Sequence, residues 1–143
     1  MSLDYLTAAP GPAPVVHPGN APWWQALAAG ELRLPRCTGC GTVRFPPAEA
    51  CWRCLSFGYE LAEVTTTGTV ETSVVVKRVT GRSRWQADVP YRTGLIALGG
   101  FRLPGRIVCS CGAAGTPGTP VTAGLLATVD GPPVLGFAHA CPG

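Results

Sequence analysis

Four of the seven cysteines lie close together, in the stretch CTGCGTVRFPPAEACWRC that spans residues 37 to 54. They form two C-x-x-C pairs separated by ten residues: Cys37, Cys40, Cys51 and Cys54. Each pair can fold into a tight knuckle whose backbone N–H groups face the sulfurs, and Gly41 permits a left-handed turn after the first pair. Four thiolates complete the tetrahedral shell of Zn²⁺, so the cluster predicts a structural metal site with no open position for catalysis.

The same cage of four thiolates can hold iron, which would make the cluster a redox centre. Zinc is the preferred metal, because an electron carrier does not require the strands that follow the cluster. Residues 31–56 carry too few apolar side chains to fold without a cross-link or a bound metal, so metal binding is expected to supply folding free energy. We therefore expect one structural Zn²⁺ and no catalytic metal.

A second group of potential ligands lies near the end of the chain. Cys109 and Cys111 alternate along one expected strand, and His139 and Cys141 alternate along another. Residues two apart on a strand share a face, so these side chains could form a second metal site or a redox pair. Free cysteines are also among the most buried residue types. The favoured interpretation is therefore that the cysteines are small core residues and that His139 is hydrogen-bonded.

The composition predicts a chain built mainly from strands. Hydrophobic residues make up 46% and charged residues 13%, with 19 glycines and 15 prolines among 143 residues. Gly and Pro end strands and weaken helix interiors, so short strands joined by tight turns are expected. The net charge is +3 and the arginines are spread along the chain, which disfavours a nucleic-acid partner.

Composition and hydrophobic pattern divide the chain into four parts. The first 19 residues, rich in Ala, Pro and Gly, predict a flexible N-terminal arm. The other parts are expected to be a docking helix over 20–31, a ribbon over 32–56 and a barrel over 57–143. Within the barrel region, alternation predicts strands at 58–65, 68–79, 90–98, 105–111, 120–128 and 133–140. The first two form one strand bent at Gly68, so five strand units remain, which is typical of a small closed barrel.

The expected helix carries two adjacent tryptophans. Asn20 is a plausible N-cap and Gly30 a natural residue after the helix end. Trp24 points to a stripe beside the one formed by Trp23, Ala26 and Leu27. The favoured interpretation packs both tryptophans on the chain's own barrel, and the alternative is that one anchors a partner.

Several of these features together resemble a known family. They are the segment PWWQALAAG, the phrase GELRLPRCTGCG, the FPP between the knuckles, and the barrel phrases TTTGTVETSVVV and PYRTGLIAL. The chain resembles the acyl-CoA-associated family that joins an N-terminal helix, a rubredoxin-like zinc ribbon and a C-terminal OB-fold. The resemblance covers about residues 20 to 140. It implies a mainly β protein, with a short helix, the zinc ribbon and a five-stranded OB-fold barrel.

The resemblance also implies a function. Members of this family are accessory subunits of thiolase-fold aldolases, thiolases and acyltransferases that act on acyl-CoA, as in steroid side-chain or polyketide-type metabolism, and others accompany hot-dog-fold hydratases. The chain would then be a non-catalytic subunit in a hetero-oligomer, with acyl-CoA shared at the interface. Two other classes stay open: a single-stranded nucleic-acid-binding OB module and an iron redox carrier.

Four residues are the candidate contacts with a partner or ligand: Trp23, Trp24, Arg44 and Trp85. The arginines around the ribbon (Arg33, Arg36, Arg44 and Arg53) could meet CoA phosphates, but a solvated face is the favoured interpretation. Trp85 belongs to a basic loop with Arg82 and Arg84, a loop type through which OB-folds bind ligands.

The sequence lacks the motifs of the common enzyme classes. No Ser-His-Asp order, H-E-x-x-H, G-x-G-x-x-G or P-loop occurs, and eight acidic residues with two histidines leave few general acid–base groups. No window holds the apolar run of a membrane span, and the N-terminus has no signal-peptide pattern. A cytoplasmic location with reduced thiols, and no membrane partner, is therefore expected.

Overall fold

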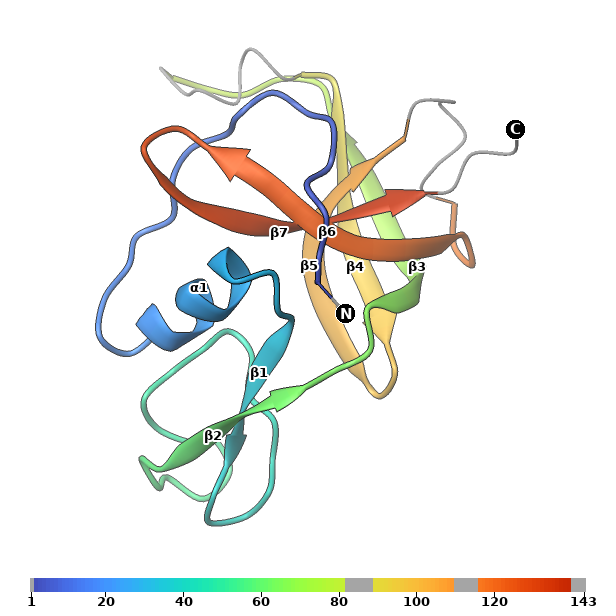
Figure 1. Cartoon of the computed structure of the whole chain (residues 1–143). Coiled ribbons are helices and arrows are strands. Elements are labelled where there is room, and N and C mark those ends of the chain that lie inside the picture. The colour runs from blue at the N-terminus through green and yellow to red at the C-terminus, as the bar shows by residue number, and fades with distance from the viewer. Residues whose placement is uncertain (1, 82–88, 110–115, 140–143) are drawn as a thin grey trace.

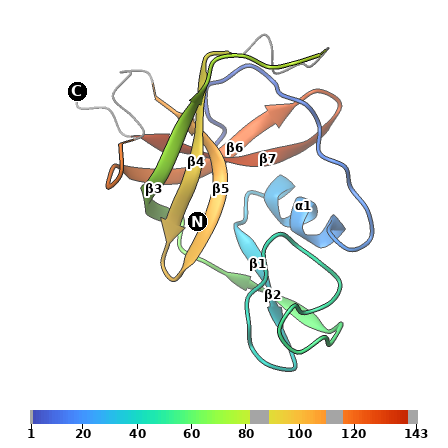
Figure 2. The same cartoon turned by 180° about the vertical axis from the view of Figure 1, so that it is seen from behind.

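The computed structural model describes residues 2–81, 89–109 and 116–139. Within them, a short helix, a two-stranded ribbon and a five-stranded closed barrel follow one another (Figure 1; Figure 2). The helix and strands are α1 (Ala21–Ala28), β1 (Arg33–Cys37), β2 (Tyr59–Glu63), β3 (Thr67–Val76), β4 (Tyr91–Leu98), β5 (Phe101–Val108), β6 (Pro120–Thr128) and β7 (Gly131–His139).

Helix α1 begins and ends where the sequence predicts. Its N-cap position is Asn20, whose side chain bonds the preceding loop instead of the helix: its Nδ2 donates to the carbonyl oxygen of Val15 at 3.1 Å. Gly30 follows the helix with a φ of +81°, the left-handed conformation that favours glycine. The buried residues are Trp23, Ala26 and Leu27, the stripe expected from helical spacing. No helix of the described ranges is long and apolar enough to cross a membrane.

The ribbon is larger than the sequence predicts. Strands β1 and β2 pair antiparallel, with Arg33 opposite Glu63 and Cys37 opposite Tyr59. Strand β2 therefore belongs to the ribbon, whereas the alternation in the sequence predicts it as part of a bent first strand of the barrel. The correction has a physical reason: Leu61 and Ala62 are half-buried against β1, and alternation alone does not identify the partner strand.

The barrel has the strand order β3-β4-β5-β7-β6 and closes through pairing of β3 with β6. Its neighbours are antiparallel except for β5 and β7, which run parallel over Arg106–Val108 and Gly136–Ala138. The third and fifth barrel strands are thus adjacent, as the OB topology requires. Pro104 lies before the parallel stretch, where β5 pairs with β4 alone, and strands tolerate proline at such an edge.

The N-terminal arm is not free over residues 3–11, which corrects the prediction of a flexible arm. The arm forms two backbone hydrogen bonds with Leu125 of β6. The Leu6 N–H donates to the Leu125 carbonyl, and the Leu125 N–H donates to the Asp4 carbonyl, both at 2.8 Å. Gly11 continues the pairing with β6 through its N–H bond to the Ala127 carbonyl at 3.1 Å. The arm covers a stretch of β6 that β3 does not reach. Backbone pairing of this kind leaves no periodic pattern in the sequence.

One hydrophobic core joins the helix, the ribbon and the barrel. Helix α1 lies between β7 and the ribbon (Figure 1), and Leu27 has no exposed surface. Leu34 of the ribbon and Phe137 of the barrel are equally buried and belong to the same cluster. The helix therefore packs between the ribbon and the barrel and joins them through one hydrophobic core.

Candidate metal centre and partner-binding surface

The four cysteines of the two C-x-x-C pairs meet at the end of the ribbon. Their sulfur atoms all lie within 4.8 Å of one another; those of Cys37 and Cys54 are 3.4 Å apart, and those of Cys40 and Cys51 are 3.7 Å apart. Four sulfurs bound to Zn²⁺ at about 2.3 Å stand about 3.8 Å from each other, so the arrangement fits a tetrahedral ion. The prediction that these residues are positioned to bind a metal is confirmed.

The two C-x-x-C pairs form two loops of the same design, which we call the first knuckle (residues 37–42) and the second knuckle (residues 51–56). The N–H of Gly41 donates to the carbonyl of Cys37, and the N–H of Leu55 donates to that of Cys51, each at 2.9 Å. The residue after the second cysteine is left-handed in both, with a φ of 75° at Gly41 and 64° at Leu55. The first knuckle meets the predicted need for glycine, and the second does not.

Leu55 is the unexpected residue of this pair. A left-handed conformation costs a residue with a Cβ atom about 1–2 kcal/mol, and glycine avoids that cost. Its side chain is 74% exposed, so burial within this chain does not compensate the strain. Backbone strain of this kind is concentrated at functional sites, so the surface around Leu55 is a candidate functional surface.

The hydrogen bonds around Cys37 favour its thiolate form. The pKa of Cys37 is lowered to about 5, first by the side-chain hydrogen bond with Ser56 and next by the backbone of Cys40, against the opposing effect of desolvation. The Ser56 Oγ lies 3.0 Å from the Cys37 sulfur and 3.1 Å from the Cys54 sulfur. A sulfur that is already anionic is prepared for a metal ion, because metals bind thiolates and not thiols.

Arg44 is a structural support and not a surface contact. Its side chain is 1% exposed, and its guanidinium donates to the carbonyl oxygens of Ala48 and Glu49 at 2.9 Å and of Gly58 at 3.0 Å. The guanidinium also lies 5.0 Å from the centre of the Tyr59 ring. These partners hold the long loop between the knuckles against β2. The predicted role of Arg44 as a contact is therefore corrected, because a buried side chain cannot reach a partner.

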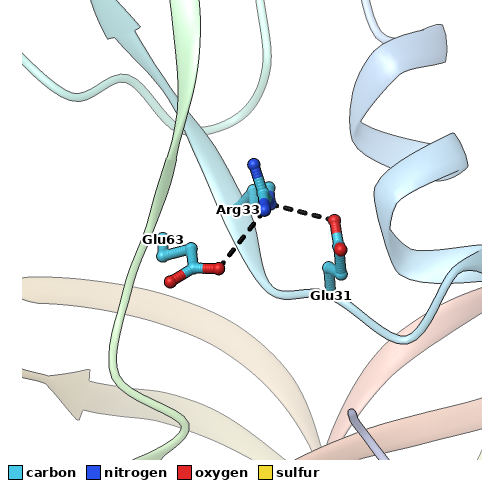
Figure 3. Close-up of polar contacts among 3 residues, drawn as sticks. All are labelled: Glu31, Arg33 and Glu63. Carbon is cyan, nitrogen blue, oxygen red and sulfur yellow. Dashed lines mark hydrogen bonds and ion pairs between the residues drawn. The ribbon is translucent and has the colours of Figure 1, made fainter. Parts of the chain in front are cut away.

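Arg33 is held by carboxylates on both sides (Figure 3). Its Nε lies 2.9 Å from Glu31, just before β1, and its Nη2 lies 3.2 Å from Glu63, so the second ion pair links β1 to β2. Arg36 and Arg53 are exposed. The four arginines around the ribbon thus divide into two that support the fold and two that face solvent.

The two helix tryptophans differ in exposure. Trp23 is 3% exposed and packs edge-on against Phe45 of the ribbon, with ring centres 5.5 Å apart. Its predicted partner contact is corrected in favour of the alternative, in which it packs within the chain. Trp24 is half-buried against the core, and its contact role stays a prediction. Trp85 lies outside the described residues.

Three large apolar side chains of the second knuckle and its exit were missed in the sequence. Trp52 is 71% exposed and Phe57 is 72% exposed, beside the 74% exposed Leu55. We call these three residues the second-knuckle face. The available signal was their position: a closed metal site has no interior large enough to bury residues that flank its ligands. Large exposed apolar residues so close together in the chain make this loop a candidate interaction surface.

The second group of potential ligands is partly described. Cys109 and His139 lie side by side at the ends of β5 and β7, with 3.4 Å between the Cys109 Sγ and the His139 Nδ1. Cys111 and Cys141 lie outside the described residues. The expectation that His139 is hydrogen-bonded is met by this contact, whereas Cys109 is half-buried instead of fully buried.

Two family models match consecutive parts of the chain. One, described as the ChsH2 rubredoxin-like zinc ribbon domain, matches residues 24–60. The other, described as the ChsH2 C-terminal OB-fold domain, matches residues 62–126. Their common border lies in β2, close to the change from ribbon to barrel in the structure.

Solved structures share this architecture. A chain of a structure named "Ltp2-ChsH2(DUF35) aldolase" aligns with a TM-score of 0.75 and 28% identity, over 90% of this chain and 99% of that chain. A Sulfolobus solfataricus protein of the DUF35 family, of unknown function, aligns with a TM-score of 0.57 over 87% of both chains. At 15% identity the second likeness shows the fold alone.

A curated relative comes from Thermomonospora curvata and is named a probable enoyl-CoA hydratase alpha subunit. It is 32% identical over 87 residues, which are 61% of this chain and 26% of the relative. The chain spans about a quarter of the length of that protein.

Proposed function

Because the chain belongs to the ChsH2 (DUF35) family, in which a zinc ribbon precedes an OB-fold, we propose that it is an accessory subunit of an enzyme that acts on acyl-CoA. Its partner is a thiolase-fold enzyme, an aldolase, thiolase or acyltransferase. The observation that carries this proposal is the alignment with a chain of the Ltp2-ChsH2 aldolase, which covers 90% of this chain and 99% of that chain. The partner supplies the catalytic groups and this chain supplies binding surface.

The second-knuckle face is the surface proposed to meet the partner. Trp52, Leu55 and Phe57 are each more than 70% exposed, although large aromatic and aliphatic side chains gain most from burial. Tryptophan is enriched among the residues that dominate binding energy at interfaces. The strain retained at Leu55 agrees with selection for contact over stability.

One Zn²⁺ held by Cys37, Cys40, Cys51 and Cys54 would give this face its rigidity. When bound, the ion supplies folding free energy to a loop region that has little core of its own. The two knuckles already exchange hydrogen bonds across the site, since Ser56 of the second contacts Cys37 of the first. The metal thus has a structural task, and the four-thiolate shell leaves no position for substrate.

The test is purification of the tagged, zinc-loaded chain from its native host, with identification of the proteins that accompany it. A thiolase-fold protein should be recovered and should co-elute in gel filtration. A double variant, Trp52→Ala with Phe57→Ala, should lose that protein while keeping the wild-type thermal midpoint and metal content. Recovery of the chain as a monomer, or with oligonucleotides in a salt-dependent manner, would overturn the proposal.

A second candidate partner is an acyl-CoA hydratase of the hot-dog fold, and one observation favours it. The Thermomonospora curvata relative is named as a hydratase subunit, and three quarters of its length lies outside the alignment. The purification separates the candidates directly, because a hydratase and a thiolase-fold enzyme differ in mass and peptide identity. Calorimetry with an acyl-CoA on the isolated chain and on the complex then shows whether the interface is needed for binding the thioester.

A further inference from the structure

The end of the barrel away from the ribbon contains a pocket that the proposed docking role does not use. Its volume is about 460 Å³, and β3, β4, β5 and the N-terminal arm form its walls. The β4–β5 hairpin turns toward the ribbon, so the start of β4 and the end of β5 lie at the opposite end (Figure 1). Val75, Arg92, Ile107 and Cys109 are among the lining residues.

The parallel pairing of β5 and β7 places a thiol beside an imidazole at this end. Ile107 lies opposite Phe137 in the ladder, and both side chains are buried in the barrel core. Residues two positions further along a strand share that face, which brings Cys109 next to His139. The Cys109 Sγ lies 3.4 Å from the His139 Nδ1, within hydrogen-bonding range for sulfur. Both residues are half-buried, and Cys109 is one of the residues that line the pocket.

We propose that Cys109 and His139 form a reactive thiol–imidazole pair that adds to α,β-unsaturated carbonyl compounds entering this pocket. His139 accepts the thiol proton at Nδ1, and the sulfur forms a bond to the β carbon of the electrophile. The electrons of the C=C bond move to the α carbon and the carbonyl oxygen, and the enolate takes the proton back from His139. The addition consumes no co-reactant, and the imidazole returns to its neutral form.

Arg92 gives the pocket a preference for electron-rich oxygen. Arg92 is among the lining residues, and its Nη1 donates to the Ser73 Oγ at 3.4 Å, which links the side chain to β3. A guanidinium carries five N–H donors, so Arg92 keeps donors beyond the one on Ser73 that suit a carbonyl or carboxylate. Arg92 therefore acts as a positioning residue that favours anionic electrophiles over neutral ones.

The test measures the rate at which the full, zinc-loaded chain is alkylated at pH 7 by N-ethylmaleimide, a neutral probe of this class. Fragment mass spectra assign the adduct to Cys109. We expect Cys109 to react at least about tenfold faster in the folded chain than in urea, because a neighbouring base raises the thiolate fraction. His139→Gln should abolish the acceleration, and His17→Gln, which changes the other histidine, should leave it intact.

A second probe tests the role of Arg92. Maleimidopropionate carries a carboxylate, and Arg92→Gln should lower its rate relative to N-ethylmaleimide several-fold. A Cys109 rate no faster in the folded chain than in urea would overturn the proposal, and this comparison needs no variant. A second zinc per chain that Cys109→Ser removes would also overturn it, because the sulfur would then be a ligand and not a nucleophile.

Discussion

The first and second knuckles have the same backbone conformation but carry different side chains on their surfaces. In both, the first cysteine's N–H donates to the carbonyl five residues later, from Cys37 to Thr42 at 2.9 Å and from Cys51 to Ser56 at 2.8 Å. The first knuckle surrounds its cysteines with Thr38, Gly39 and Gly41, whereas the second uses Trp52, Arg53 and Leu55. Metal ligation stabilises the backbone of a short loop, so the outward side chains of that loop are not needed for its folding. In this chain only the second knuckle has large apolar residues at those positions.

The difference separates two kinds of evidence for function. The shared hydrogen bonds explain folding, and they are satisfied equally well by small residues. The side chains of Trp52 and Leu55 are more than 70% exposed, and Leu55 is also left-handed, so their size gains little from this fold. Features that cost stability and have no partner within the described chain are therefore the ones we assign to docking.

The largest expected effect tests whether the knuckles are equivalent at the metal. Cys37→Ser and Cys51→Ser should each remove the bound zinc and unfold the ribbon, because structural zinc sites contribute about 10–16 kcal/mol of apparent binding free energy. Metal analysis by mass spectrometry and circular dichroism check the result. A soluble Cys51→Ser chain with full metal content would show that the second knuckle is not a ligand pair.

The next prediction tests whether the knuckles differ at the partner. Trp52→Ala should weaken partner binding by about 2 kcal/mol, roughly 30-fold, as expected for a buried aromatic anchor. Thr38→Ala changes the equivalent position of the first knuckle and should leave the affinity unchanged. Calorimetric titration of each variant with the purified partner measures both. Equal losses in the two variants would mean that the whole ribbon end, and not the second-knuckle face, makes the contact.

A reciprocal exchange at the left-handed positions sharpens the comparison further. Gly41→Leu should lower the unfolding free energy by about 1–2 kcal/mol through its φ alone, because no atom lies within 4 Å of an added Cβ. Leu55→Gly should leave stability unchanged or raised, yet weaken partner binding. Thermal melts and titrations give both quantities. A strongly destabilised Leu55→Gly chain would mean that Leu55 packs in the fold, and the docking assignment would fail.

The metal ligands and most of the architecture could be predicted from the sequence because their signals are local. Ligand spacing, the glycine at position 41 and the alternation in the later strands each depend on a few neighbouring residues. The short helix was also recovered from Asn20, Gly30 and a three-residue apolar stripe. Local rules of this kind hold when the backbone conformation follows from residues close in the chain.

The remaining features depend on contacts between distant segments. Arg44 is a charged residue in a loop by sequence, and three carbonyls from two segments make its burial favourable. The arm pairs with β6 through backbone N–H and C=O groups, which nearly every residue has, so the residue types in the arm do not predict this pairing. Trp52 is different, because its exposure follows locally from its position beside a metal ligand, where the knuckle has no interior to hold the ring.

The smallest expected effect concerns a hydroxyl that occupies the same position in both knuckles. Thr42 Oγ1 accepts from the Cys40 thiol at 3.2 Å, and Ser56 Oγ contacts Cys54 in the matching way, but Ser56 also reaches across to Cys37. Ser56 is the main cause of the lowered pKa of Cys37, about 5, so this thiol is ionised above that pH and becomes protonated as the pH falls through it. Protonation competes with the metal, and zinc retention is lost in that direction.

Removing the Ser56 hydroxyl should therefore raise the pKa of Cys37 and shift the acid release of zinc to higher pH. Ser56→Ala and the matched Thr42→Val are compared by following released zinc with a colorimetric chelator during acid titration. The midpoint should move upward in Ser56→Ala and move less in Thr42→Val, because Thr42 contacts one ligand sulfur and Ser56 contacts two. Equal shifts would mean that each knuckle prepares only its own sulfurs. An upward shift confined to Ser56→Ala would instead show that the second knuckle lowers the pKa of a ligand in the first knuckle.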